Sequence, residues 1–220
     1  MTATRANEIL SILKNNFSMP RWASSTRNPF QTLIVTIISQ NTAGKNTAKA
    51  FERLSKKFQI APEALAKADE REIEDALRVA GLFRNKAKTI KNVSQIVLEK
   101  FNGSLDLVHL MPLEEARKTL LTLPGVGPKT ADVVLLFSAG KSTIPVDTHV
   151  NRVSKRLGLA PAKADYEDIR IALQSLYAPE DFLAVHLLLI TLGQTYCRAL
   201  KPICLRCPVN SLCPSKRIED

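Results

Sequence analysis

The sequence lacks a hydrophobic run long enough to cross a membrane. Its longest apolar stretch, FLAVHLLLITLG, is interrupted by His186 and is shorter than the roughly 20 residues that a membrane-spanning helix needs. The first residues, MTATRANEILSILKNNF, contain no long apolar segment and carry Arg5 and Glu8, so they do not match a secretory signal. We therefore expect a soluble protein with no membrane partner, and the absence of a targeting extension suits a prokaryotic cytoplasm.

Cysteine is absent from the first 196 residues, and all four cysteines follow within a short C-terminal stretch with the spacing C-x6-C-x2-C-x5-C. They are Cys197, Cys204, Cys207 and Cys213. In a reducing compartment, clustered cysteines are more typical of metal ligands or catalytic groups than of disulfides. Four thiolates suit either zinc or a [4Fe-4S] cluster. The single C-x2-C pair is unlike usual structural zinc sites, but the spacing also differs from ferredoxin-type runs, so it leaves the metal open.

Acidic residues are too few to balance the basic ones. The chain has 31 Lys and Arg against 21 Asp and Glu, a net charge of +10 and a pI near 9.6. Such an imbalance attracts polyanions, and nucleic acid is the leading candidate partner. The alternative is a basic surface that only maintains solubility. With 45% hydrophobic and 24% charged residues, the composition is that of a globular protein and not of a disordered chain.

Neither strand alternation nor an internal repeat is visible along the chain. Apolar residues instead recur at helical spacing, beginning with Ile9, Leu10 and Leu13. The segment PFQTLIVTII predicts a buried helix that starts at Pro29. Further helices are expected at residues 43–57, 62–68, 70–79, 86–100, 113–121, 129–138, 148–157, 165–176 and 180–196. The predicted fold class is therefore all-α.

One predicted helix carries signals at both of its ends. Asp69 precedes the helix and Glu72 follows three residues later, which is the pattern of a capping box. At the other end, Gly81 is expected to take the left-handed conformation that ends many helices.

The segment LPGVGPKTADVVLLF places two glycines on either side of Val126, followed by Pro128 and a helix. Glycine brings bare backbone N–H groups close to whatever lies outside a turn, and a helix N-terminus adds a partial positive charge. Together they make an anion site, which on a basic protein suits a nucleic-acid phosphate. The alternative is an ordinary turn between two helices.

Two ionisable residues near helix starts are candidates for chemistry. Lys129 stands in the first turn of a helix, where the dipole disfavours a cation and favours the free amine that a nucleophile requires. The alternative is a surface lysine in contact with solvent or a phosphate. Asp147 stands just before a helix opened by Thr148, where a carboxylate caps backbone N–H groups and needs no catalytic role.

LPGVGPKTA, VDTHVNRV and the terminal C-x6-C-x2-C-x5-C occur in this order. In these motifs, and over nearly the whole chain, the sequence resembles endonuclease III and its DNA-glycosylase relatives. The resemblance implies two helical lobes with a DNA-binding cleft between them, in a monomer. A six-helix barrel with a helix-hairpin-helix motif would span residues 23–140, and residues 1–22 and 141–220 would form a domain that carries the cysteine loop. The Gly- and Pro-containing link at residues 137–147 fits this boundary.

The resemblance further implies a base-excision-repair DNA glycosylase that is also an AP lyase. Lys129 would attack C1′ of a damaged nucleotide and expel the base, and Asp147 would stabilise positive charge on the sugar and assist proton transfer. The resulting Schiff base would allow β-elimination of the 3′ phosphate. Because the sugar and base are inaccessible in a duplex, the nucleotide must first leave the base stack.

The same resemblance assigns residues to DNA binding. Gln40 or Asn41 would fill the space left by the displaced nucleotide, and Leu82 would enter the duplex as an apolar wedge. Gly44 stands where many relatives carry an acidic residue. The hairpin turn would contribute Leu123, Gly125, Val126, Gly127 and Thr130. The cysteine loop would present Arg198, Lys201 and Arg206 to phosphates, and the alternative for these three is a solvated basic loop.

For the four cysteines, the resemblance implies a [4Fe-4S] cluster with a largely structural role, and zinc is the alternative. For function, it implies removal of damaged, oxidised pyrimidines. Two alternatives stay open: a mismatch-specific thymine or uracil DNA glycosylase of the same superfamily, and a non-catalytic DNA-binding protein.

Overall fold

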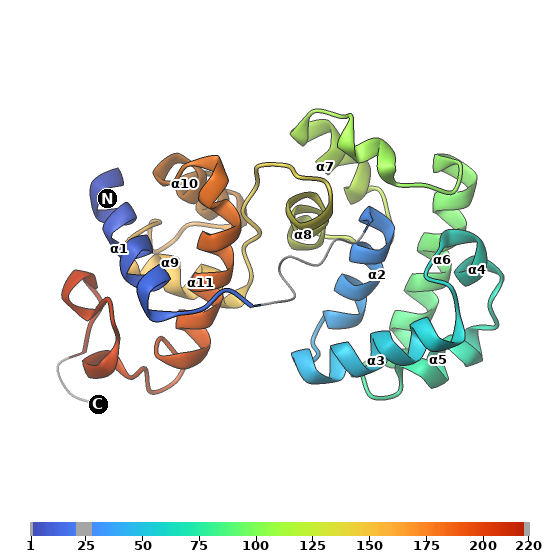
Figure 1. Cartoon of the computed structure of the whole chain (residues 1–220), viewed down its shortest axis with the longest axis horizontal. Coiled ribbons are helices and arrows are strands. Elements are labelled where there is room, and N and C mark those ends of the chain that lie inside the picture. Colours follow the sequence, from blue (N-terminus) through green and yellow to red (C-terminus); the bar gives the residue numbers. More distant parts are fainter. Residues whose placement is uncertain (1, 21–27, 218–220) are drawn as a thin grey trace. The chain divides into compact units, whose positions relative to one another are not determined.

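The computed structural model describes residues 2–20 and 28–217 (Figure 1). The described residues form helices and connecting turns without any strand, so the all-α prediction is confirmed. Contacts divide the chain into a central unit, Thr26–Lys141, and a terminal unit made of Met1–Ser25 and Ser142–Asp220. The predicted domain boundary at residues 22 and 23 lies outside the described residues. The predicted boundary after residue 140 stays a prediction.

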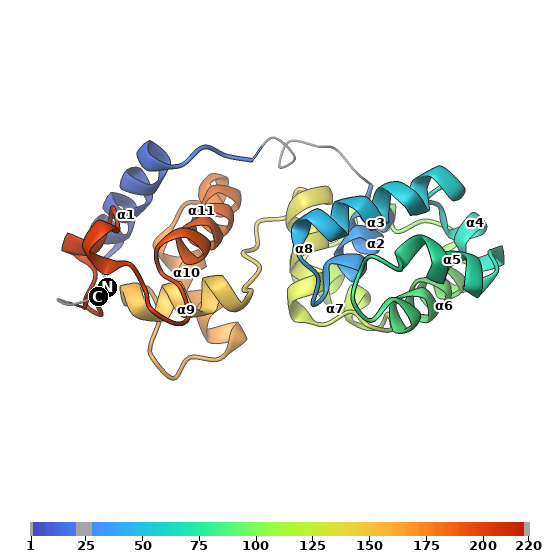
Figure 2. The same cartoon turned by 90° about the horizontal axis from the view of Figure 1, so that it is seen from below.

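The central unit is assembled around α2 (Pro29–Ser39), which α3, α6 and α8 contact. Leu33, Ile34, Ile37 and Ile38 are fully buried, so α2 is the core helix that its apolar sequence predicts. The other elements of the unit are α3 (Gly44–Lys57), α4 (Pro62–Lys67), α5 (Glu70–Leu77), α6 (Phe83–Phe101), the 3-10 helix η2 (Asp106–His109), α7 (Leu113–Leu121) and α8 (Pro128–Ser138). Figure 2 shows α7 and α8 as neighbours, consecutive helices joined by a short turn.

The junction between α5 and α6 differs from its prediction at both helices. Asp69 caps α5 as expected, but Glu72 forms an ion pair with Lys57 and does not complete a capping box. Gly81 is not left-handed; the positive φ of 58° belongs to Leu82. Because Leu82 is the N-cap of α6, this helix begins at Phe83 and not at residue 86.

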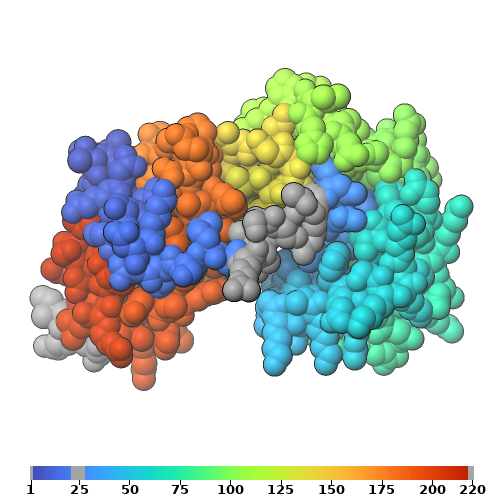
Figure 3. Space-filling model, viewed as in Figure 1, coloured from blue at the N-terminus to red at the C-terminus, as the bar shows by residue number. Residues whose placement is uncertain are grey.

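The terminal unit joins the N-terminal helix to the C-terminal helices. It contains α1 (Ala3–Asn16), α9 (Thr148–Leu157), α10 (Tyr166–Leu176), the 3-10 helix η3 (Pro179–Asp181), α11 (Phe182–Thr195) and the 3-10 helices η4 (Cys204–Arg206) and η5 (Asn210–Leu212). The largely buried α11 packs against α9 and α1. Figure 3 shows the blue atoms of the N-terminal segment lying against the orange and red atoms of the C-terminal part.

No single helix in the described part of the chain is long and apolar enough to cross a membrane. The segments Tyr166–Leu176 and Pro179–Thr195 reach that length and composition only as a pair, and they are bent by 119° at their junction.

Candidate functional site

The turn between α7 and α8 requires glycine at one position and leaves space at another. Gly125 has a φ of 73°, and a Cβ there would lie 2.6 Å from Cγ2 of Thr89. Leu123 and Val126 are buried and anchor the turn to the core. A Cβ on Gly127 would meet no atom within 4 Å, and no side chain caps α8. The first N–H groups of α8, which have no partner inside the helix, are therefore suited to bind an external anion.

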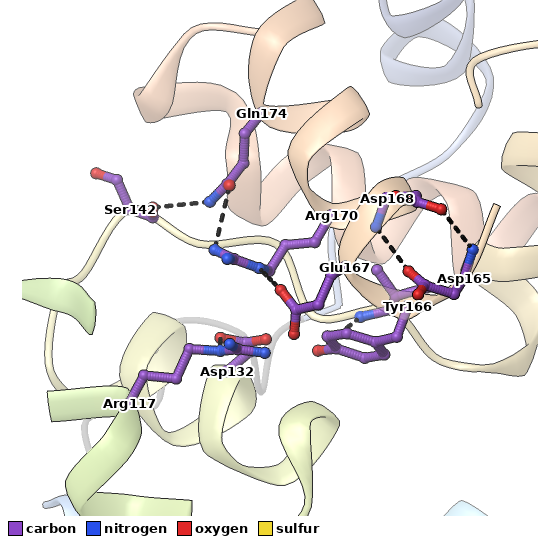
Figure 4. Close-up of polar contacts among 10 residues, drawn as sticks. Arg117, Asp132, Ser142, Asp165, Tyr166, Glu167, Asp168, Arg170 and Gln174 are labelled. Carbon is purple, nitrogen blue, oxygen red and sulfur yellow. Dashed lines mark hydrogen bonds and ion pairs between the residues drawn. The ribbon is translucent and has the colours of Figure 1, made fainter. Parts of the chain in front are cut away.

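Lys129 is the second residue of α8 and is half-buried. Asp132 has the i,i+3 spacing of an ion-pair partner for this lysine, but Arg117 of α7 binds the carboxylate instead (Figure 4). The Arg117 Nε and Asp132 Oδ1 atoms are 3.0 Å apart, and the two side chains are 9% and 0% exposed. Lys129 forms no ion pair with any residue that the structure describes. Its amine is therefore not occupied by a carboxylate of the central unit.

Asp147 is the N-cap of α9, as predicted from its place before Thr148. Its Oδ1 accepts a hydrogen bond of 2.7 Å from the N–H of Val150. Just before it, the carbonyl of Pro145 accepts a 2.9 Å hydrogen bond from Nδ1 of buried His186, which fixes the approach to the cap. Within residues 2–20 and 28–217, the second carboxylate oxygen of Asp147 has no hydrogen-bond partner. Lys129 lies in the central unit and Asp147 in the terminal unit.

Asn41 and Leu82, the residues compared above with DNA-inserting positions, share an unusual backbone conformation. Their φ angles are 51° and 58°, in the left-handed region that residues other than glycine seldom occupy. Leu82 is 60% exposed. The two turns meet closely, because a Cβ on Gly81 would lie 3.5 Å from the carbonyl oxygen of Asn41. Backbone strain of this kind costs on the order of 1 kcal/mol per residue and is concentrated at functional sites.

Gln40 differs from Asn41 in what its side chain contacts. The Nε2 of Gln40 donates to the carbonyl of Gly125 at 3.1 Å and to Oγ1 of buried Thr130 at 3.4 Å. The exposed Asn41 side chain forms no hydrogen bond within the described residues. Of the two predicted plug residues, Asn41 is thus the one with an available side chain, while Gln40 joins the α2–α3 turn to the hairpin turn.

Lys86 is a buried polar residue that the sequence analysis missed. It is only 4% exposed, and its Nζ donates to the carbonyl of Ile38 at 2.8 Å and to Oγ1 of Thr42. Desolvation lowers the pKa of its amine. Lysine is almost never fully buried, but the helical period gave a signal, because Lys86 stands four residues before buried Ile90 on α6.

The four cysteines surround one space. All four are free of disulfides and line a cavity of about 240 Å³, together with residues from α9 and α11. No three His, Cys, Asp or Glu side chains of the described residues are grouped so that they could hold a single metal ion. The four sulfurs line the same cavity and form one potential donor set, which by its chemistry suits zinc or an iron-sulfur cluster.

Burial disfavours the thiolate form at two of the four cysteines. Burial raises the pKa of the Cys207 thiol to about 11 and also raises the pKa of Cys213. Because thiolates are the form that binds metal, loading the loop must release protons.

Arginines hold the cysteine loop by its carbonyl groups. Arg156 of α9 donates to the carbonyls of Arg198 at 2.6 Å and Ala199 at 3.1 Å, and its Nη1 lies 3.6 Å from Sγ of Cys197. Arg5 of α1 donates to a carbonyl in the same loop, that of Leu212. The predicted phosphate-binding cations of the loop, Arg198, Lys201 and Arg206, are all exposed. The loop therefore keeps its positive side chains at the surface while its backbone is bound.

Comparison with known proteins identifies relatives over most of the chain. Residues 34–179 match the HhH-GPD superfamily of base excision DNA repair proteins. Endonuclease III of Sulfolobus acidocaldarius is 39% identical over 189 residues, covering 86% of this chain and 82% of that protein. Endonuclease III of Escherichia coli is 32% identical, with 100% of both chains covered. The solved structure of a trapped endonuclease III–DNA covalent intermediate matches with a TM-score of 0.85 at 32% identity, covering 98% of this chain and 97% of that one.

Proposed function

Because the chain belongs to the HhH-GPD superfamily of base excision DNA repair proteins, we propose that it removes oxidised pyrimidines from DNA with Lys129 as nucleophile. The chain is a DNA glycosylase and AP lyase that binds DNA as a monomer, as its similarity to endonuclease III over nearly its whole length establishes. The observation that supports Lys129 is its place in the first turn of α8 without an ion-pair partner among the described residues, while Arg117 binds the neighbouring Asp132.

In the proposed reaction, the neutral amine of Lys129 forms a bond to C1′ as the bond from C1′ to the base breaks. The departing base takes a proton, and the amine nitrogen, positively charged after the attack, loses one proton. The bond from C1′ to the ring oxygen O4′ then breaks, O4′ takes a proton, and a protonated Schiff base remains. This cation draws electrons from C2′, so a C2′ proton can be removed. The electron pair then forms a double bond between C2′ and C3′ while the 3′ phosphate leaves. The strand is thereby cut without water attacking the phosphate.

Asp147 is the proposed carboxylate partner of this reaction. Positive charge develops on the sugar as the base leaves, and an ionised carboxylate stabilises such charge. The cap bond from Val150 uses Oδ1 only, which supports a role for the other oxygen in contact with the substrate. The cap and the catalytic role are therefore compatible in one side chain.

Nucleotide extrusion is the proposed task of Asn41 and Leu82. The exposed apolar side chain of Leu82 suits insertion between base steps, and the unbonded Asn41 side chain suits hydrogen bonding to the base left unpaired. The hairpin turn would hold a backbone phosphate at the start of α8. Arg198, Lys201 and Arg206 would add sequence-independent attraction to the phosphates.

The proposed cofactor is a [4Fe-4S] cluster bound by Cys197, Cys204, Cys207 and Cys213. When bound, such a cluster would supply a rigid cross-link among four points of the loop. Its support is the four-sulfur donor set around a cavity of about 240 Å³. We place the protein with the chromosomal DNA of a prokaryotic cytoplasm, a proposal that the archaeal and bacterial sources of the two endonucleases III support.

Borohydride trapping on duplex DNA with one abasic site tests the nucleophile. Wild-type protein is expected to form a covalent adduct, which Lys129→Gln loses because an amide cannot form an imine. Lys118→Gln removes an exposed lysine from the other helix of the hairpin and should trap as wild type does. Undiminished trapping by Lys129→Gln would remove this lysine from the nucleophile role.

Asp147→Asn separates the cap from the chemistry. Asparagine caps helices about as well as aspartate, so the melting temperature should stay close to that of wild type. Loss of the charge should slow single-turnover excision of an oxidised pyrimidine by about a hundredfold. Excision at the wild-type rate would leave Asp147 with a structural role only. A panel of duplexes that includes thymine and uracil mismatches would show which base is preferred.

A further inference from the structure

We propose that Lys86, Thr42 and Gln40 form a brace that positions Asn41 and Leu82 for nucleotide extrusion. The proposal rests on the proposed function and concerns how its extrusion step is prepared. In it, Lys86 is a positioning residue that acts through its neighbours and does not contact DNA.

The brace is a directed chain of hydrogen bonds. The ammonium group of Lys86 can only donate, and it donates to Oγ1 of Thr42. The Thr42 hydroxyl in turn donates a hydrogen bond to the carbonyl of Gln40, at 3.2 Å. The Gln40 side chain continues to the carbonyl of Gly125 at 3.1 Å. Every donor in this series has an acceptor, and the series ends at the turn proposed to bind phosphate.

Both DNA-inserting residues are attached directly to this chain. Asn41 lies between Gln40 and Thr42, so both of its sequence neighbours are fixed while its own side chain stays exposed. The backbone N–H of Lys86 donates to the carbonyl of Leu82 at 3.1 Å. This is the ordinary helical bond that any residue at position 86 makes, so the part specific to lysine is the bond from its side chain to the α2–α3 turn. The Lys86 side chain therefore ties that turn, which carries Asn41, to the first turn of α6, whose N-cap is Leu82.

Burying the Lys86 amine costs desolvation free energy, a cost that a residue needed only for packing would avoid. It is 4% exposed and has no carboxylate partner among the residues described, and an apolar side chain of similar length avoids the desolvation of an amine. One bond, to the carbonyl of Ile38, lies in the last turn of α2, where a cation is favoured. A lysine that only capped α2 would need no second bond beyond the helix. The bond to Thr42 leads out of α2 into the turn that carries Asn41.

The brace would keep Asn41 and Leu82 in their strained backbone conformations before DNA binds. A residue held at positive φ relaxes to other conformations unless its surroundings restrain it. Without the brace, Asn41 and Leu82 would have to be ordered during the extrusion step, which adds to its free-energy barrier. With the brace, that ordering is complete before DNA binds. The effect should therefore appear only where a nucleotide has to leave a base stack.

Three full-length variants test this proposal. Lys86→Met removes the amine and keeps an unbranched chain. Thr42→Val breaks the brace but leaves the bond from Lys86 to Ile38 intact, so it separates positioning from capping of α2. Lys88→Met removes an exposed lysine of the same helix and controls for the loss of one positive charge.

Each variant is assayed on two DNA substrates under single-turnover conditions. The first is a duplex with an oxidised pyrimidine next to 2-aminopurine, whose fluorescence reports unstacking. The second is a single strand with an abasic site, which needs no extrusion from a duplex. Lys86→Met and Thr42→Val should lower the duplex excision rate and the rate of the fluorescence rise by about tenfold, the effect of losing one hydrogen bond to a charged group. Their single-strand cleavage should match wild type, and Lys88→Met should match wild type on both substrates.

The outcomes separate the brace from the proposed function. Wild-type rates of extrusion in Thr42→Val, with a lower melting temperature in Lys86→Met, would reduce Lys86 to a cap of α2 and overturn the proposal. Equal losses on duplex and single strand would also overturn it, because positioning for extrusion cannot affect a strand without a stack. If wild-type protein leaves an abasic site uncut and untrapped in single-stranded and in duplex DNA alike, the proposed lysine chemistry fails, whatever the variants do.

Discussion

The central unit and the cysteine loop are held together by different forces. The central unit buries a continuous set of large apolar side chains, with Leu33, Ile34, Ile37 and Ile38 of α2 fully inaccessible. Across residues 197–217, only Pro202 and Val209 are buried. The loop depends instead on arginines bound to its carbonyls and on four cysteines around a cavity. Two surfaces proposed to bind the same DNA are thus held in different ways: the central unit by apolar packing, and the loop by arginine hydrogen bonds and the proposed cross-link through its cysteines.

Replacing a cysteine should have the largest effect, and this effect should be confined to the cysteine loop. In Cys207→Ser, the loop loses one of its four ligands and has almost no apolar burial to replace the cross-link. We expect loss of iron and of the absorption at roughly 400 nm that thiolate-ligated clusters give. Amide hydrogen exchange across residues 197–213 should become fast while α2 and α6 stay protected. Full retention of iron, or equal loss of protection in the loop and in the central unit, would show that the two regions are not stabilised in different ways.

A cavity made in the central unit should have the opposite effect: it should lower the stability of that unit and leave the iron content of the loop unchanged. Ile37 is fully buried, so Ile37→Ala is expected to cost about 2–5 kcal/mol of unfolding free energy, measured by denaturant titration. Iron content per folded molecule should not change. Ile171→Ala, at a position 57% exposed on α10, is the matched control and should stay within about 0.5 kcal/mol of wild type. A cost at Ile37 no larger than at Ile171 would show that apolar packing does not dominate this unit.

Surface charge on the loop should have the smallest effect and leave folding untouched. Arg206 is exposed, so Arg206→Gln should keep the iron and the melting temperature of wild type. One fewer phosphate contact lowers the slope of log K against log salt by about 0.9, with the same change for every DNA sequence. Fluorescence anisotropy at several salt concentrations measures the slope. Lys163→Gln, an exposed lysine outside the loop, should not change it; an equal change in both variants would assign the effect to net charge.

Elements whose ends are set by local signals were predictable from sequence. The bounds of α7 and α9 agree with residues 113–121 and 148–157. The cap at Asp147 also followed from its place before Thr148. In each case the residues that end or begin the helix are neighbours in the sequence, so local chemistry is sufficient to locate the boundary.

Features set by tertiary contact were not predictable. Glycine tolerates a positive φ better than leucine, so the left-handed residue was expected at Gly81 and lies instead at Leu82. At Gly81 the absent side chain serves a close approach to Asn41 of another turn. The separate roles of Gln40 and Asn41 depend on Gly125, distant in sequence. Lys86 was missed because exposure is the rule for lysine.

The terminal unit is built from both ends of the chain, with α1 packed against α11. During translation at roughly 5–20 residues per second, the interval between these helices lasts about ten seconds to half a minute. The apolar face of α1, with Ile9, Leu10 and Leu13, lacks its α11 partner during that time, in which the whole central unit is made. The cysteines leave the ribosome after α11. Any metal that the four cysteines bind can therefore be delivered only after α11 has been made, and until then the nascent chain exposes a helix that chaperones can recognise.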